Sequence, residues 1–209
     1  MKKILLSVFA LSAFALSAQT FVSTTPENKN VILEELTGIS CGYCPDGHAV
    51  AKGIVDGAPN DVAVINIHST SFANPQGPGT DFRTTEGTAI NSYWNNTSAP
   101  MGTINRNAAP AGRGSWASAA QAVLAQTSPV NVGVQASVDM TTNVLTVNVE
   151  VYYTGSQTVT SNKLSIAVVQ NNVEGPQSGS SANPSSVLSN GNYNHNHMLR
   201  YMMTGTWGE

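Results

Sequence analysis

The chain has 209 residues, of which 10% are charged, and its formal net charge is −3 at pH 7. Nucleic-acid binding requires a strongly basic surface, which a slightly acidic chain with few charges does not provide, so we expect no nucleic-acid partner. The length is enough to bury one large hydrophobic core or two small ones.

The N-terminal segment is typical of a secretory signal peptide. Two lysines precede an apolar run from Ile4 to about Leu16, and the small residues Ser17 and Ala18 follow it. The run is shorter than the roughly 20 residues that cross a bilayer, so residues 1–18 predict an export signal rather than a membrane helix. We therefore expect an exported protein of the periplasm, outer membrane or cell surface. No transmembrane helix is predicted, and association with the outer membrane is expected to be peripheral.

Residues 19–29 show no hydrophobic periodicity, and we interpret them as a flexible lead. The apolar run 31–38 then predicts a strand, and a helix-compatible stretch extends from Pro45 to about Val55. The β-branched run 61–69 alternates little, which is typical of a central strand covered on both faces. Because the crossover between the two strands is short, we predict that they pair in parallel.

Two more helices and a strand complete this part of the chain. Residues 82–95 place apolar side chains at helical spacing, a strand is expected just after Pro100, and the Ala-rich stretch 115–126 predicts another helix. Strands and helices that alternate in this way predict an α/β layer domain over residues 30–127.

The hydrophobic pattern changes after Pro129. In residues 130–140, 144–153 and 164–168 the apolar side chains recur at every second position, which is typical of half-buried antiparallel strands. We therefore predict an antiparallel β-sandwich domain over residues 128–209. Such sandwiches have about seven strands, and only one further extended segment follows here, so we expect an incomplete domain and a chain that is a fragment.

Cys41 and Cys44 are the two cysteines of the chain, and they form a CGYC motif between the first strand and the first helix. Three chemistries fit the motif: a redox-active dithiol, half of a metal site, and a structural disulfide. Export favours the oxidised pair. A position in the first helical turn lowers a thiol pKa, so we expect Cys41 to be the exposed attacking thiol and Cys44 to resolve the mixed disulfide. Pro45 supports this geometry, since proline is tolerated in the first turn of a helix.

A metal site requires more ligands than the motif provides. Cys41, Cys44 and His48 are three candidates, but the next histidines along the chain, His195 and His197, belong to the other predicted domain. We therefore expect no metal and no cofactor. The pair at 195 and 197 is predicted to share one face of a strand, at a surface or ligand-facing edge.

The segment 31–126 resembles the thioredoxin-like superfamily. The shared features are the strand VILEELTG that leads into CGYCP, the helix behind it, the second strand VAVINIH, and TSAP at the start of a later strand. The resemblance implies that Pro100 is cis and faces the dithiol, and that the backbone of Ala99 contacts a bound peptide. It also implies that Glu35 is a buried acid with a raised pKa that assists proton transfer at Cys44. From the residues alone, Glu35 also fits a solvent-facing position at the end of the strand.

The motif departs from the superfamily in the residues around the cysteines. Ser40 stands where thioredoxins commonly have tryptophan, and Gly42 and Tyr43 separate the two cysteines without adding a cation. We expect Gly42 and Tyr43 to contact the substrate together with Ala99. Because no charge lies between the cysteines, the sequence leaves open whether reduction or oxidation is favoured.

The whole arrangement is similar to the bacterial outer membrane protein 28-related family. The matching features are the export signal, the segment EELTGISCGYCPDG and the C-terminal sequence HNHMLRYMMTGTWGE. The similarity implies a thioredoxin-like α/β domain followed by an Ig-like β-sandwich, and a location at the outer membrane or cell surface.

Two functions of different classes remain open. The first is an exported thiol-disulfide oxidoreductase that acts on protein thiols or disulfides through Cys41 and Cys44. The second is a non-enzymatic surface binding or assembly protein in which the thioredoxin-like unit is a scaffold. In that case the cysteines stay in a structural disulfide and the partner is a surface ligand.

Overall fold

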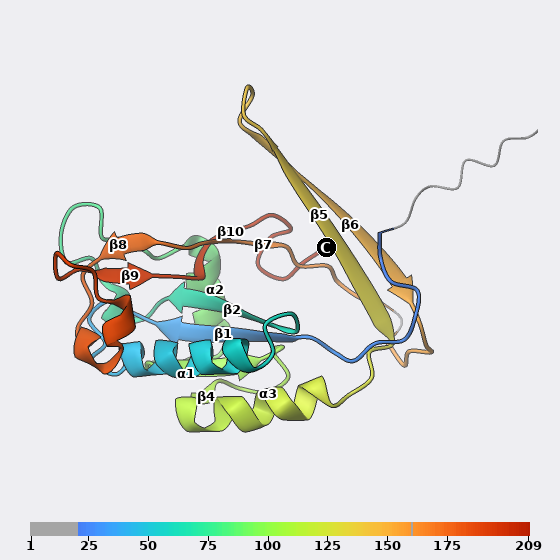
Figure 1. Ribbon diagram of the computed structural model, residues 1–209, viewed down its shortest axis with the longest axis horizontal. Helices are drawn as coiled ribbons and strands as arrows, with labels where there is room; N and C mark the ends of the chain where they lie inside the picture. Colours follow the sequence, from blue (N-terminus) through green and yellow to red (C-terminus); the bar gives the residue numbers. More distant parts are fainter. Residues whose placement is uncertain (1–20, 160) are drawn as a thin grey trace, which may run out of the picture. The chain divides into compact units, whose positions relative to one another are not determined.

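The computed structural model describes residues 21–159 and 161–209 (Figure 1). The signal peptide expected at residues 1–18 and the first two residues of the expected lead lie outside the described residues. The described chain forms two compact units. One comprises Pro129–Gly155 and the residues up to Pro26, and the other comprises Glu27–Ser128 and Ser156–Glu209. The division into units therefore differs from the expected boundary between residues 127 and 128, because residues 156–209 belong with the α/β part.

The helices and strands follow one another in a mixed order. The helices are α1 (Cys44–Gly57), α2 (Thr85–Tyr93) and α3 (Trp116–Leu124), with short 3-10 helices η1 (Ser71–Ala73), η2 (Arg113–Ser115), η3 (Ser180–Ala182) and η4 (Pro184–Ser186). The strands are β1 (Val31–Thr37), β2 (Val62–His68), β3 (Met101–Ile104), β4 (Ala111–Gly112), β5 (Val130–Asp139), β6 (Val144–Tyr153), β7 (Ala167–Gln170), β8 (Val173–Gly175), β9 (Tyr193–His195) and β10 (Met198–Met202). In the described part of the chain, no helix has the length and hydrophobicity to span a membrane.

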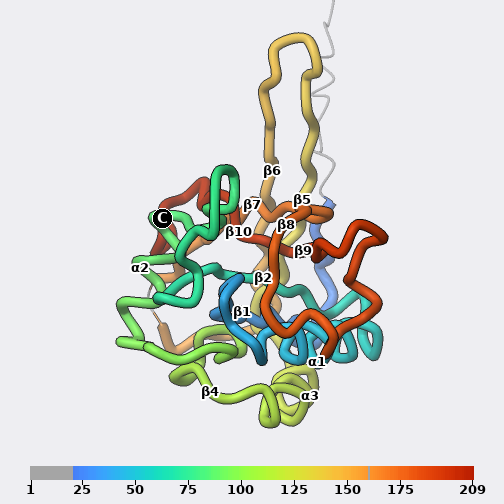
Figure 2. Tube along the Cα trace, turned by 90° about the vertical axis from the view of Figure 1, so that its left-hand side faces the viewer, coloured from blue at the N-terminus to red at the C-terminus, as the bar shows by residue number. Residues whose placement is uncertain are grey.

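A six-stranded mixed sheet with the order β4-β3-β1-β2-β10-β7 forms the centre of the larger unit (Figure 2). β1 and β2 pair in parallel along their whole length, from Val31 opposite Val62 to Thr37 opposite His68, which confirms the prediction of parallel pairing. β3 pairs antiparallel with β1 on its other side. β1 therefore has a hydrogen-bonded strand on each side, and its position within the sheet is fixed.

Different helices cover the two faces of this sheet (Figure 1). On one face, α1 and α3 pack on a cluster that consists of Val31, Leu33, Ala51, Val62, Val64, Ile104, Trp116, Ala120 and Val123. On the other face, α2 packs on a cluster that consists of Leu36, Ile67, Ile90, Leu199 and Met202. Since side chains alternate along a strand, Val31, Leu33 and Glu35 share the face that α1 covers.

The first part of α1 lies close to the sheet at Gly47. A Cβ atom added at Gly47 would lie 2.6 Å from Oε1 of Glu35 and 2.9 Å from Cβ of Pro100. Both distances are too short for real contacts, so the helix can lie here only because residue 47 has no side chain. A Cβ at Gly53, in the same helix, would meet no atom within 4 Å.

The strand pairing differs from the separate sandwich expected over residues 128–209. β5 and β6 form a two-stranded sheet, and β8 and β9 form another, while β10 and β7 extend the main sheet beside β2. The amide of Asn66 in β2 donates to the carbonyl oxygen of His197 at 2.7 Å, so the edge of β2 is paired. Alternating hydrophobicity identifies half-buried strands but does not say which sheet they join, and this is why the expectation differs from the structure.

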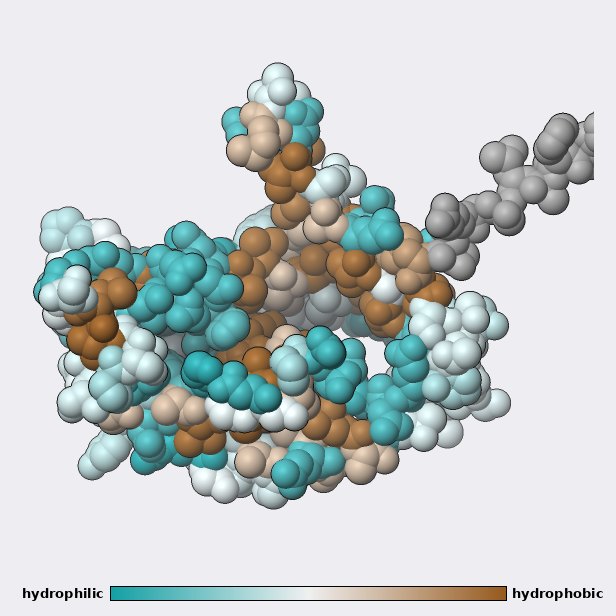
Figure 3. Space-filling view, in the orientation of Figure 1, coloured by the Kyte–Doolittle hydropathy of each residue, from teal (hydrophilic) through white to brown (hydrophobic). Residues whose placement is uncertain are grey.

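The β5–β6 hairpin carries most of its apolar side chains on one face. The cross-strand pairs Val132 with Val151, Val134 with Val149, and Val138 with Leu145 lie on that face. Several of these side chains are half-exposed, and hydrophobic residues are visible along the hairpin in Figure 3. The predicted period of two is therefore confirmed for both strands.

The contrast between the two glycines of α1 yields a matched pair of substitutions. We expect Gly47→Ala to lower the free energy of unfolding by about 1 to 3 kcal/mol, because the new methyl group overlaps Glu35 and Pro100. We expect Gly53→Ala to raise it by roughly 0.5 to 1 kcal/mol, because alanine restricts the unfolded chain and meets open space in the folded one. Urea unfolding of both variants with the disulfide intact measures the difference. Equal effects of the two substitutions would contradict the close approach at Gly47.

Candidate functional site

The two cysteines form a disulfide at the junction of β1 and α1. The Cα atoms of Cys41 and Cys44 are 5.4 Å apart, and the Cys44 amide donates to the carbonyl oxygen of Cys41 at 3.4 Å. α1 begins at Cys44 with Pro45 in its first turn, as the sequence predicts. Cys41 precedes the helix, in the turn that follows β1.

Cys41 is covered by another part of the chain. Its exposed fraction is 2%, so the prediction of an exposed attacking thiol is wrong for the oxidised protein. We call residues 176–179 the cover segment, because they lie over the cysteine loop. Nε2 of Gln177 donates hydrogen bonds to the carbonyl oxygens of Gly38 at 3.2 Å and of Cys41 at 3.0 Å.

The backbone of the cover segment makes further contacts with the same loop. The Ser178 amide donates to the carbonyl oxygen of Ile39 at 2.8 Å. Gly179 has a φ of +70°, and a Cβ at this position would overlap the carbonyl group of Gly42. Glycine is therefore required both by the backbone conformation and by the close approach. The chain beyond β8 reaches the N-terminal end of α1 in Figures 1 and 2.

The residues expected to contact a substrate differ in exposure. Tyr43 is 70% exposed and Gly42 is exposed, whereas Ala99 is half-buried. The guanidinium of Arg113 lies 5.7 Å from the centre of the Tyr43 ring. The Ala99–Pro100 peptide bond is cis, as the thioredoxin resemblance implies, and Pro100 is buried against α1 near Gly47.

Glu35 lies on the face of β1 that α1 covers, and its exposed fraction is 0%. In the described chain neither carboxyl oxygen has a hydrogen-bond partner. Burial raises the pKa of the Glu35 carboxyl well above its ordinary value of 4.5, which favours the neutral, protonated form. The alternative of a solvent-facing Glu35 is therefore wrong, while its part in proton transfer stays a prediction.

His48 connects β1 with the segment that contains β9. Its Nε2 atom lies 3.0 Å from Oγ1 of Thr37 and 3.7 Å from Oε1 of Glu35. On the opposite edge of the ring, Nδ1 lies 2.9 Å from the hydroxyl oxygen of Tyr193. That hydroxyl oxygen also accepts a hydrogen bond from Nδ2 of Asn183 at 2.9 Å.

The environment of His48 keeps its ring neutral. Burial, together with repulsion from His195 and His197, lowers the pKa of His48 to about 3. Because the Glu35 carboxyl is also favoured in its neutral form, the 3.7 Å approach joins two neutral groups and is not an ion pair. The separation is slightly longer than a hydrogen bond.

Two further histidines lie in a buried aromatic cluster. The ring centres of His68 and His195 are 5.4 Å apart, and Phe82 lies 5.4 Å from His68 and 5.1 Å from His195. Burial lowers the pKa of His195 to about 4 and that of His68 well below its ordinary value. His195 is the last residue of β9 and is buried, whereas His197 lies beyond the strand with a φ of 54°. The prediction of a shared strand face for His195 and His197 is therefore wrong.

The described residues contain no group of three or more histidine, cysteine, aspartate or glutamate side chains that could hold a metal ion. Cys41 and Cys44 are joined in the disulfide, so their sulfur atoms are not thiolate ligands in this state. His48 points instead toward Thr37 and Tyr193.

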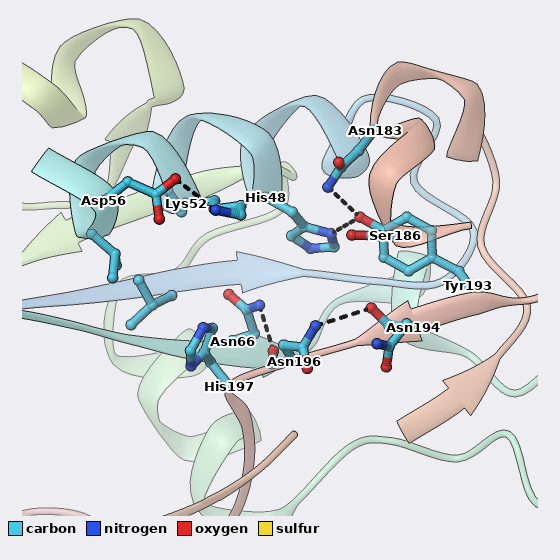
Figure 4. Close-up of a pocket in the computed structure, with 13 residues that line it drawn as sticks. His48, Lys52, Asp56, Asn66, Asn183, Ser186, Tyr193, Asn194, Asn196 and His197 are labelled. Atoms are coloured by element: carbon cyan, nitrogen blue, oxygen red, sulfur yellow. Dashed lines mark hydrogen bonds and ion pairs between the residues drawn. The ribbon is translucent and has the colours of Figure 1, made fainter. Parts of the chain in front are cut away.

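A cavity of about 230 Å³ lies between α1, β2 and the segment from η4 to β9 (Figure 4). We call it the polar cavity. Its walls consist of His48, Ala51, Lys52, Val55, Asp56, Val64, Asn66, Asn183, Ser186, Tyr193, Asn194, Asn196 and His197. His48 is part of this wall, so the polar cavity reaches the ring that contacts Glu35.

Three residues of the cover segment and the polar cavity have little in the sequence that marks them as functional. Gln177, Asn183 and Tyr193 lie in or next to the polar stretch 171–192, which has no hydrophobic period. A long polar connection in a compact protein is itself a weak signal, since such loops are commonly functional. Asn66 has a clearer signal, because it is a polar residue in the middle of the apolar run of β2.

Comparison with known proteins places the chain in a family. A model of the family described as Outer membrane protein Omp28 matches residues 87–209, which is more than half of the chain. No curated protein matches the sequence. The matched region begins after Cys41 and Cys44, so the family match does not include the disulfide.

Two solved structures have a similar fold. HBP35 of Porphyromonas gingivalis is 18% identical with a TM-score of 0.66, and the alignment covers 88% of this chain and 60% of that one. Protein AGR_C_4864 from Agrobacterium tumefaciens is 12% identical with a TM-score of 0.54, and 86% of this chain and 74% of that one are covered. The chain thus spans about 60% of the length of HBP35. The family match, which covers more than half of the chain, leads to one conclusion about identity: the chain belongs to the Outer membrane protein Omp28 family.

Proposed function

We propose that the protein is an exported, thioredoxin-like thiol–disulfide exchange protein of the outer membrane or cell surface. The observation that carries this proposal is the position of the Cys41–Cys44 disulfide between β1 and the first turn of α1. The buried carboxyl of Glu35, in β1, lies beside Gly47 of the same helix. The parallel β1–α1–β2 unit and the cis bond before Pro100 agree with a thioredoxin-like arrangement.

Exchange would begin with a substrate thiolate that attacks the sulfur of Cys41. A mixed disulfide forms, the Cys41–Cys44 bond breaks, and Cys44 leaves as a thiolate. The protonated carboxyl of Glu35 then gives its proton to the Cys44 thiolate. A second thiolate of the substrate attacks the mixed disulfide and releases Cys41, so the substrate becomes oxidised and the protein becomes the dithiol. The same steps in reverse reduce a substrate disulfide.

A peptide substrate would meet the exposed part of the cysteine loop first. Tyr43 and Gly42 are exposed there, and the half-buried backbone of Ala99 precedes the cis proline. We assign these three residues to substrate contact. The exposed ring of Tyr43 can pack against an apolar side chain of the peptide, and the Ala99 backbone can pair with the peptide backbone.

A second function is favoured by a different observation, the burial of Cys41 under the cover segment. A disulfide that stays closed in this way would be structural, and the protein would then act as a surface binding or assembly protein. The choice depends on whether the cover segment opens. Its attachment to the cysteine loop includes the two hydrogen bonds from Gln177 and one from the Ser178 amide.

Single cysteine substitutions test the exchange chemistry. We expect Cys44→Ser to accumulate mixed disulfides with glutathione, because Cys41 remains as the attacking thiol and the resolving thiol is missing. We expect Cys41→Ser to accumulate few, because the cover segment contacts Cys41 and Gly42 and its opening uncovers Cys41, whereas Cys44 lies within the first turn of α1 with an exposed fraction of 0%. Mass spectrometry of each variant after incubation with oxidised glutathione measures the adduct. Equal adduct formation by both variants, or by neither, would count against the exchange function.

Loosening the cover segment separates the two functions. We expect Gln177→Ala to speed reduction of the disulfide by reduced glutathione by roughly thirtyfold, because two hydrogen bonds worth about 1 kcal/mol each are removed. The matched control is Gln76→Ala, because Nε2 of Gln76 binds Oγ of the exposed Ser40 beside the same loop without covering Cys41. Thiol alkylation followed over time gives both rates. If the Gln177 variant is reduced no faster than the control, the cover segment does not gate the cysteines.

A further inference from the structure

We propose that His48 carries protons between the carboxyl of Glu35 and the water of the polar cavity. The inference rests on the proposed thiol exchange and adds to it the route by which protons enter and leave. His48 acts through Glu35 and not on the reacting sulfur atoms, so we call it a positioning residue and not a catalytic residue.

Glu35 requires such a route because it is closed off from solvent. Its exposed fraction is 0%, and neither carboxyl oxygen has a hydrogen-bond partner in the described chain. After the Glu35 carboxyl has given its proton to Cys44, it must take up another proton before it can act as a donor again. Direct exchange with bulk water is blocked by α1 on one side and by the sheet on the other.

His48 is the polar group that lies between Glu35 and the polar cavity. Nε2 of its ring faces β1, 3.7 Å from Oε1 of Glu35 and 3.0 Å from Oγ1 of Thr37. A shift of about 0.5 Å or more brings the Nε2 atom and the Glu35 oxygen within hydrogen-bond distance. The other nitrogen, Nδ1, lies 2.9 Å from the hydroxyl of Tyr193. Imidazole can accept a proton at one nitrogen and release one from the other, which is what a relay requires.

The far side of the relay opens into the polar cavity. The hydroxyl of Tyr193, held by Nδ2 of Asn183 at 2.9 Å, and the ring of His48 both contribute to its wall (Figure 4). A volume of about 230 Å³ has room for several water molecules, each of which occupies about 30 Å³ in the liquid. Burial and the neighbouring histidines lower the pKa of His48 to about 3, so its resting ring is neutral, with one nitrogen that carries a proton and one that can accept a proton.

The protons balance over the reaction cycle. When Cys44 leaves as a thiolate, Glu35 gives up its proton and becomes a carboxylate. His48 then donates from Nε2 to Glu35 and takes a proton at Nδ1 from the Tyr193 hydroxyl, which regains one from water in the polar cavity. Re-formation of the disulfide sends one proton back along the same path, so the original tautomer of His48 is restored.

Chemical rescue distinguishes this relay from a purely structural histidine. We expect His48→Ala in the complete protein to slow exchange between the disulfide and glutathione by at least about tenfold, since general acid–base groups commonly contribute a hundredfold or more. The space left by the ring joins the polar cavity, so added imidazole is expected to restore the rate. Pyrrole has the same ring size and no basic nitrogen, and we expect it to restore nothing. The control variant Gln121→Ala, which alters an exposed side chain of α3 outside the polar cavity, is expected to keep the native rate.

Other results would overturn the relay. A native rate in His48→Ala, or equal rescue by imidazole and pyrrole, would mean that the ring only fills space. If His48→Ala does not fold, His48→Gln is measured instead. Its polar side chain can keep a contact with Thr37 or Tyr193 but cannot transfer a proton from one end to the other. A native exchange rate in this variant would also overturn the proposal. If the native protein itself does not exchange with glutathione, the proposed function fails and the relay fails with it. If the native protein exchanges and the His48 variants match it, the relay alone fails.

Discussion

The rest of the candidate site depends on the buried carboxyl group of Glu35, which has no hydrogen-bond partner among the described residues. β1 pairs with β2 and β3, so the alternation of its side chains sends Glu35 toward α1. The helix can lie against that carboxyl because residue 47 is glycine. Burial raises the pKa of Glu35 and so favours its protonated form, and His48 lies between this carboxyl and the polar cavity. These are the positions that the proposed proton transfer from Glu35 to Cys44 requires.

The C-terminal part of the chain completes this site. Residues 156–209 supply β10 and β7 to the main sheet, the cover segment over Cys41, and Tyr193 beside His48. These residues lie within the region that matches the Omp28 family, whereas the cysteines lie before it. The chain therefore joins a cysteine motif in its first half to a covering segment in its second half, and under the proposed function the reactivity of the disulfide would depend on both.

Much of the first half could be predicted from the sequence. The apolar run of β1, the turn at the cysteines and Pro45 indicate a strand, a loop and a helix, and local rules of this kind need no distant partner. The pairing partners of the later strands could not be predicted from such local rules. Period-two hydrophobicity marks β5, β6 and the stretch 164–168 that leads into β7, but it cannot show that β7 joins the main sheet through β10. The cover over Cys41 could not be predicted either. Gln177 lies in a polar stretch without hydrophobic periodicity, and it donates to backbone carbonyl groups, which every residue has.

The most direct test of this account is the pKa of Glu35 in the oxidised protein. Carbon-13 NMR of the glutamate side-chain carboxyls, with the Glu35→Gln variant to assign the signal, follows the protonation of that one group with pH. We expect a midpoint well above the ordinary value of 4.5, because among the described residues no group donates a hydrogen bond to the buried carboxylate. A midpoint at or below 4.5 would show that the carboxyl is charged at neutral pH and would contradict its role as the proton donor to Cys44.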